Sequence, residues 1–150
     1  MPREKAFTVN VPCEGERAAS MCYSVPVTRE KTFVVNVLRP LLLACCEDCR
    51  MLEVRGTLGV PDLLFLRGGA PGFVEVKFQE RPGRALRLSG AQVSFLNACP
   101  QYSWLLVGFA GDEAMVWPGG EVRYGMRSRG GLWVPLTVEA LAAIFQVPKS

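Results

Sequence analysis

Apolar positions recur at helical spacing in the segment that follows residue 28. The spacing predicts a helix over residues 29–49, with Thr28 as its N-cap and Glu30 in its first turn. Pro40 lies inside this segment and lacks a backbone donor, so we expect it to kink the helix or divide it in two. The apolar positions that share the helical spacing are Phe33, Val34, Val37, Leu38, Leu41 and Leu42.

Strand-like runs and turn residues alternate in the middle of the chain. Residues 50–56 predict a strand that ends at a glycine, and residues 61–66 predict a buried strand that begins with a proline. Residues 72–78 predict its partner, because "RGGAPG" between the two has the composition of a hairpin turn. Alternation along the partner puts Phe73, Glu75 and Lys77 on one face and Val74, Val76 and Phe78 on the other.

The remaining segments complete an α/β pattern. Ser89 predicts the start of a helix that stops at Pro100, and Thr137 caps a C-terminal helix within residues 136–145. Residues 102–110 and 113–118 predict a strand pair, and "AFTVNV" near the N-terminus predicts a short strand or extended arm. The order of helix, three strands, helix, two strands and helix predicts an α/β (α+β) fold around a mixed sheet.

Composition narrows the chemistry that such a fold can carry out. The chain has 150 residues, 49% of them hydrophobic, which suits one domain with a sizeable core. It contains no histidine, which excludes a Ser-His-Asp triad, a Cys-His pair and a histidine-based zinc hydrolase. Any hydrolysis would therefore depend on carboxylates, lysine, hydroxyls and a hard metal ion.

The chain lacks the apolar segments of a membrane or exported protein. No apolar run approaches the ~20 residues that span a bilayer. The charged start, "MPREKAFTVN", lacks the apolar region of a signal peptide. We therefore expect no membrane contact and a location in the cytoplasm, a nucleoid or a nucleus.

The cysteines of an intracellular chain of this size are expected to be reduced thiols. Cys46 and Cys49 form a C-x-x-C, which could join two further cysteines in a metal site, and redox chemistry is the other alternative. The six cysteines are Cys13, Cys22, Cys45, Cys46, Cys49 and Cys99.

Arginines gather in two short segments of a chain whose net charge is only +3. Such clusters suit contact with a phosphate backbone, and solubility is the alternative explanation. The first segment holds Arg81, Arg84 and Arg87, and the second holds Arg123, Arg127 and Arg129. The tryptophans Trp104, Trp117 and Trp133 are expected to pack in the core or at its rim rather than stack on bases.

Two acids and a lysine lie on the predicted hairpin. Asp62 opens one strand, and Glu75 and Lys77 share a face of the other. A buried carboxylate is costly unless it is paired or binds a metal. The set therefore suits a hard cation such as Mg²⁺ beside a lysine that stabilises charge, and a plain buried ion pair is the alternative.

These residues carry a family resemblance. "GVPD" followed by "EVK" and then by "LSGAQ" resembles the PD-(D/E)XK nuclease superfamily. Within it the chain is most similar to the virus-type replication-repair nuclease (VRR-NUC) domain, a relative of Holliday-junction resolvases. The resemblance covers residues 28–110 and implies a restriction-endonuclease-like core. It leaves residues 1–27 as an arm or extension and residues 115–150 as a C-terminal extension of one nuclease domain.

The resemblance implies a role for each matching residue. Asp62 and Glu75 would bind Mg²⁺ or Mn²⁺ together with the backbone carbonyl of Val76, and Lys77 would be the active-site lysine. Gln92 would support the site, although it could also be an ordinary exposed helix residue. Glu30 would match the acid on the first helix, or be only a first-turn acid favoured by the helix dipole. The competitors of Glu30 are Glu16, Glu47 and Glu53.

The resemblance implies a metal-dependent DNA endonuclease that acts on branched DNA or Holliday junctions in replication, recombination or repair. Arg81, Arg84, Arg87, Arg127 and Arg129 would contact duplex or branched DNA. A homodimer would suit a four-way junction, and the gene could be viral. The alternatives are an inactive nuclease fold that binds nucleic acid or protein, and a sequence-specific restriction-type nuclease. RNA is also open as a substrate.

Overall fold

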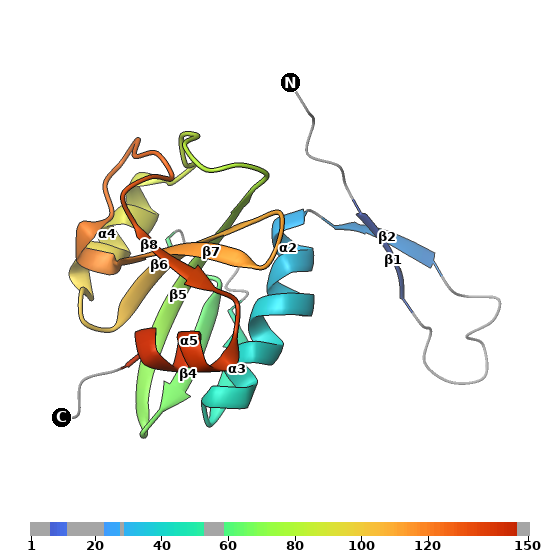
Figure 1. The fold of residues 1–150 in the computed structure, drawn as a ribbon, viewed down its shortest axis with the longest axis horizontal. Coiled ribbons are helices and arrows are strands. Elements are labelled where there is room, and N and C mark those ends of the chain that lie inside the picture. The colour runs from blue at the N-terminus through green and yellow to red at the C-terminus, as the bar shows by residue number, and fades with distance from the viewer. Residues whose placement is uncertain (1–6, 12–22, 28, 53–58, 147–150) are drawn as a thin grey trace.

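Six strands of the described residues form one mixed sheet in the order β3-β4-β5-β6-β7-β8 (Figure 1). The structure is a computed structural model, and it describes residues 7–11, 23–27, 29–52 and 59–146. Strands β5 and β6 are parallel, and the other neighbours are antiparallel. The strands are β3 Asp48–Met51, β4 Leu63–Arg67, β5 Ala70–Gln79, β6 Ser103–Phe109, β7 Glu113–Pro118 and β8 Leu132–Pro135.

A second, two-stranded sheet precedes this body. It pairs β1, Phe7–Val11, with β2, Tyr23–Val27, in antiparallel register. Strand β1 confirms the strand predicted in "AFTVNV". The predicted cap Thr28 lies outside the described residues.

The first helical segment is divided, as predicted, but it is shorter than predicted. Helix α2, Arg29–Phe33, passes through a π-helical turn, Val34–Leu38, into α3, Arg39–Cys45. In the π turn the Arg39 N–H donates to the Val34 carbonyl, which widens the helix just before Pro40, where a normal turn would meet the proline ring. The predicted end at residue 49 is wrong, because β3 pairs Cys49 with Phe65 and buries Cys49 completely.

The predicted hairpin of β4 and β5 is present, with a tighter turn than "RGGAPG" suggested. Arg67 pairs with Ala70, so only Gly68 and Gly69 lie at the tip. Their φ angles of 60° and 78° are those of the left-handed hairpin turn that glycine adopts without cost. The predicted strand over residues 50–56 begins earlier, at Asp48, and residues 53–58 lie outside the described residues.

The parallel connection between β5 and β6 runs through α4, Gly90–Ala98, which begins at the predicted cap Ser89. Helix α5, Val138–Ile144, begins at the predicted cap Thr137, whose side chain accepts from the Ala140 N–H. Strand β8 was not predicted. It is short, three of its four side chains are exposed, and its place is set by pairing with β7 rather than by an apolar pattern of its own.

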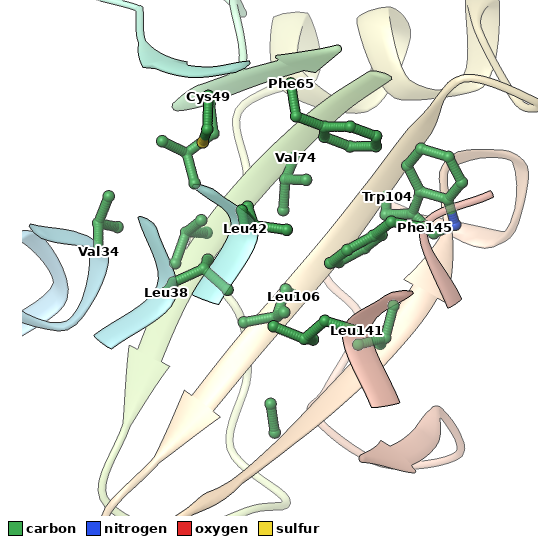
Figure 2. Close-up of a cluster of buried hydrophobic side chains, with 14 of the residues drawn as sticks. Val34, Leu38, Leu42, Cys49, Phe65, Val74, Trp104, Leu106, Leu141 and Phe145 are labelled. Carbon is green, nitrogen blue, oxygen red and sulfur yellow. The ribbon is translucent and has the colours of Figure 1, made fainter. Parts of the chain in front are cut away.

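The sheet is covered on both faces. On one face, α2, α3 and α5 pack on β4–β8 around a core that includes Leu38, Phe65, Trp104, Leu106 and Phe145 (Figure 2). On the other face, Leu96 of α4 packs with Leu105 and Val107 of β6 and with loop residues such as Leu88 and Val122. Trp104 and Trp117 are buried, as predicted, and Trp133 is 49% exposed at the rim.

Candidate active site

Asp62 lies where β4 begins and the β4–β5 ladder ends. The last pair of the ladder is Leu63 with Val74, so Asp62 comes next to Glu75. The Asp62 carboxylate accepts a hydrogen bond from the Val76 N–H at 2.8 Å. The Asp62 side chain therefore takes the place of a strand partner for the Val76 N–H, beyond the point where the β4–β5 ladder ends. The Val76 carbonyl points to the same edge of β5, because both polar groups of a strand residue face the same neighbour.

Gly59, three residues before Asp62, packs closely against α4. Its φ of +86° favours glycine, and a Cβ built on it would meet the Ala91 carbonyl oxygen at 2.5 Å. The glycine of "GVPD" thus packs directly on the first turn of α4. This contact brings the segment that carries Asp62 against the helix that carries Gln92.

Glu75 is the largely buried centre of the site. It is 2% exposed, on the face of β5 that α4 covers, and its Oε2 has no hydrogen-bond partner in the described residues. Burial, and next the charge of Asp62, raise the pKa of Glu75 from 4.5 to about 9. Lys77 acts in the opposite direction and Glu30 adds to the rise, so all four groups share one electrostatic neighbourhood.

Gln92 joins α4 to Glu75. The Gln92 Oε1 accepts from the Ser89 N–H at 2.9 Å and the Ser89 hydroxyl accepts from the Gln92 N–H at 3.1 Å, which makes a capping box. The Gln92 amide nitrogen then donates to Glu75 Oε1 at 2.6 Å. The cap fixes which end of the amide faces the site. Gln92 is therefore not an ordinary exposed helix residue.

Lys77 follows Glu75 on the same face of β5, roughly 7 Å along the strand. It is half-buried, and it is the cation whose charge opposes the rise in the pKa of Glu75. Glu30, also half-buried, lies on the first turn of α2. Beside it Arg29 forms an ion pair with Glu80 and stacks over Phe78, with the guanidinium carbon 5.3 Å from the ring centre. These contacts hold the start of α2 against the end of β5.

The competitors of Glu30 are placed differently. The exposed Glu47 accepts from the Gly68 N–H at 2.7 Å, at the hairpin tip and thus at the opposite end of β4 from Asp62. Glu16 and Glu53 lie outside the described residues. Glu30 is therefore the acid of the first helix that shares the neighbourhood of Glu75.

No group of three or more Asp, Glu or Cys side chains in the described residues is arranged to hold a metal ion. Asp62 and Glu75 supply two carboxylates, one with an unpartnered buried oxygen. This set fits Mg²⁺, which usually takes one or two carboxylates and completes its shell with waters and phosphate oxygens. Cys45, Cys46, Cys49 and Cys99 are free thiols, and Cys13 and Cys22 lie outside the described residues.

The two arginine segments come together in space through a residue that the sequence did not single out. Ser128 is fully buried, and its hydroxyl donates to Gln79 at the end of β5 and accepts from the Gly83 N–H at 2.8 Å. Backbone hydrogen bonds join Gly83 and Arg84 to Ser128, and Leu86 to Met126. Residues 81–88 and 123–129 therefore form one surface, named here the double arginine loop, which begins four residues after Lys77.

The predicted DNA-contacting arginines all lie on this double arginine loop. Arg81, Arg87, Arg127 and Arg129 are exposed, and Arg84 is half-buried. Arg127 also donates to the Gly83 carbonyl at 2.9 Å, which ties the two segments together. Arg123 is also exposed, and its side chain donates to Asn97 of α4 at 3.1 Å.

Comparison with known proteins supports the architecture. Neither a protein-family model nor a curated protein matches the sequence. Among solved structures, the chain is similar to Archaeoglobus fulgidus Hjc, a Holliday junction resolvase from an archaeal hyperthermophile, at 16% sequence identity and a TM-score of 0.50. The match covers 79% of this chain and 98% of the resolvase.

The mixed sheet and its helices have the restriction-endonuclease-like fold of that resolvase. At this identity the likeness shows the fold alone. The predicted fold class and the broad resemblance to resolvases are thereby confirmed. The narrower resemblance to the virus-type replication-repair nuclease domain has no match of its own. None of the helices in the described ranges combines the length and apolar character needed to cross a membrane.

Proposed function

We propose that this protein is a Mg²⁺- or Mn²⁺-dependent DNA endonuclease that cuts branched DNA, with four-way junctions as its favoured substrate. The observation that carries the proposal is the convergence of Asp62, Glu75, Lys77 and Gln92 at the point where β4 and β5 part. The fold shared with a Holliday junction resolvase supports this choice of substrate.

The metal would be held by Asp62, Glu75 and the Val76 carbonyl, with Glu30 at the edge of the site. Bound there, Mg²⁺ would supply Lewis acidity and positive charge to the scissile phosphate. Glu75 would give up its proton to bind the metal, and the amide nitrogen of Gln92 would hold the carboxylate in place by donating to Glu75 Oε1. Lys77 would orient the attacking water or balance charge on the phosphate.

The double arginine loop would hold the phosphate backbone beside these groups. Its first segment follows directly after the strand that carries Lys77, so DNA bound at the site would pass over the exposed guanidinium groups. Charge contacts of this kind position DNA without reading its sequence. This suits an enzyme that selects the shape of its substrate.

The test is cleavage of a labelled four-way junction, a flap, a duplex and a single strand, with Mg²⁺, Mn²⁺ or chelator. We expect metal-dependent cutting of the junction, reduced by about 10²-fold or more in Asp62→Asn, Glu75→Gln and Lys77→Met. These variants are nearly isosteric, and the new amide in Asp62→Asn retains an oxygen that can accept from the Val76 N–H. Gln92→Glu keeps an acceptor for the capping box and removes the donor to Glu75, so we expect slower cutting by a folded protein.

Glu47→Gln is the matched control, because it removes an acid at the far end of the same hairpin. It should cut as the natural protein does. A folded natural protein that cuts none of the substrates would overturn the proposal. If that protein still bound junctions, the inactive binding module would take its place.

A further inference from the structure

Tyr124 is the most exposed of the large hydrophobic side chains in the described residues, with 75% of its surface accessible. It lies in the second segment of the double arginine loop. A tyrosine ring exposed to water does not stabilise the fold through core packing. Packing therefore does not explain why a tyrosine occupies this position. Sequence reasoning missed this residue because it considered only the tryptophans as stacking groups.

The backbone holds Tyr124 on a defined turn. The Met126 N–H donates to the Arg123 carbonyl at 3.3 Å, and Gly125 has a φ of 75°. A glycine with positive φ at the third position is the signature of a type II turn, which puts Tyr124 at the outer corner. The Arg123 side chain anchors the turn by donating to Asn97 Oδ1 of α4 at 3.1 Å and to the Gly120 carbonyl at 2.7 Å. The ring is thus presented on a fixed support.

The segment that runs from Tyr124 to Arg129 carries positive charge only. The sequence has no acid between Glu121 and Glu139, whereas Arg127 and Arg129 follow the tyrosine within five residues. The neighbouring segment, residues 81–88, contributes three more arginines and no acid. The buried Ser128 keeps both segments in register. A cationic loop with an exposed ring matches a ligand that combines phosphates with flat, apolar faces.

We propose that Tyr124 stacks on an unpaired base of the DNA substrate while Arg127 and Arg129 contact the flanking phosphates. This inference rests on the proposed function and adds to it a residue that distinguishes branched from fully paired DNA. Bases at a branch point or bulge offer an open face, whereas bases inside a duplex are already stacked on each other. Stacking on an aromatic side chain tolerates any base, so it recognises structure without recognising sequence.

The test measures binding in EDTA, where cutting cannot occur, by fluorescence anisotropy. One probe is a duplex with a three-nucleotide bulge and the other is its fully paired counterpart. We expect Tyr124→Ala to weaken binding of the bulged probe roughly 5–150-fold, the usual loss for one stacked base, and to change binding of the paired probe less than twofold. Tyr124→Phe should bind both probes as the natural protein does. A 2-aminopurine in the bulge should be quenched by the natural protein and not by Tyr124→Ala.

Leu43→Ala is the matched control. Leu43 is 44% exposed on α3, across the sheet from α4, and its loss should affect neither probe. Equal weakening of both probes by Tyr124→Ala, or failure of Tyr124→Phe, would overturn stacking. Unchanged binding by Tyr124→Ala, with the natural protein active on junctions, would overturn this inference alone. A natural protein that binds neither probe would overturn the DNA-binding function and the inference together.

Discussion

Gln92 meets two hydrogen-bonding demands with one amide. Its oxygen completes the capping box with Ser89, and its nitrogen reaches Glu75 at 2.6 Å. An amide can do this because it carries an acceptor and two donors on one rigid plane. The "SGAQ" segment therefore specifies both where α4 begins and how Glu75 is oriented. The sequence pointed to Gln92 only through the family resemblance, and these hydrogen bonds give a physical reason for its place beside Glu75.

Glu75 should make the stability of the metal-free protein depend on pH. Burial and then Asp62 raise its pKa from 4.5 to about 9 in the folded state. Between these values the native state holds a proton that the unfolded chain releases, so the free energy of unfolding should fall as pH rises, by at most about 1.4 kcal/mol per pH unit. Glu75→Gln cannot titrate and should lack this decline.

Denaturant unfolding in EDTA at pH 5 to 9 measures the difference between the two proteins. The chain has no histidine, and its thiols, which ordinarily ionise at about pH 8.5, are the same in both proteins, so the difference between the two pH profiles reports Glu75. Parallel pH profiles for the natural protein and Glu75→Gln would contradict the raised pKa. Adding Mg²⁺ should flatten the profile of the natural protein, because metal binding would displace the proton.

At the scale of elements, the close contact between Gly59 and α4 is what brings Asp62 and Gln92 together. Gly59→Ala would force an alanine into a positive φ, at a cost of about 1–2 kcal/mol, and would also press its Cβ on the Ala91 carbonyl. Gly68→Ala meets the same conformational cost at φ +60° but has open space around the new Cβ. We expect Gly59→Ala to be the less stable variant and, at an equal folded fraction, the slower nuclease.

Urea unfolding of both variants, followed by junction cleavage under conditions where each is folded, checks this expectation. Equal losses of stability would show that only the backbone angle matters. Equal cleavage rates would show that the two elements can separate without harm to the site.

Local sequence patterns correctly predicted the elements that are determined by residues adjacent in sequence. They failed where pairing with a distant strand determines the structure. The β4–β5 hairpin and the caps Ser89 and Thr137 follow from residues adjacent in sequence, and all three are present. Strand β8 has exposed side chains and depends on β7. The helix predicted to residue 49 ends at Cys45 because Cys49 is taken by β3. Long-range strand pairing decides both cases, and in the second it overrides helical spacing.

The same division holds for the candidate site. Asp62, Glu75, Lys77 and Gln92 lie within one continuous stretch of the chain, so a motif could predict them. Ser128 could not be found in this way. A serine between two arginines has the pattern of a solvated loop, yet it is fully buried and bonds to residues that lie 45 and 44 positions away along the chain. Tyr124 gave no signal either, because exposure is a property of the folded chain.

At the scale of the whole molecule, charge is distributed unevenly. A net charge of +3 is too small to bind DNA strongly, but six arginines on the double arginine loop concentrate positive charge beside Lys77. Each arginine that contacts a phosphate contributes about 0.9 to the slope of log binding constant against log salt. Arg81→Ala and Arg129→Ala should each lower the magnitude of this slope by about 0.9 and weaken binding equally for all sequences.

A variant that combines Arg81→Ala with Arg129→Ala tests whether the two segments of the double arginine loop contact the same DNA together. If both segments contact the same DNA at once, Arg81→Ala with Arg129→Ala should lower the magnitude of the slope by about 1.8, the sum of the single effects. Arg50→Ala is the control for charge alone, because Arg50 is exposed on β3, at the far edge of the sheet, and pairs with Asp48 at 2.7 Å. It removes the same charge and should leave the slope unchanged. Titrations of a fixed duplex at several salt concentrations give the slopes, and an equal loss in Arg50→Ala would mean that net charge, rather than this surface, attracts DNA.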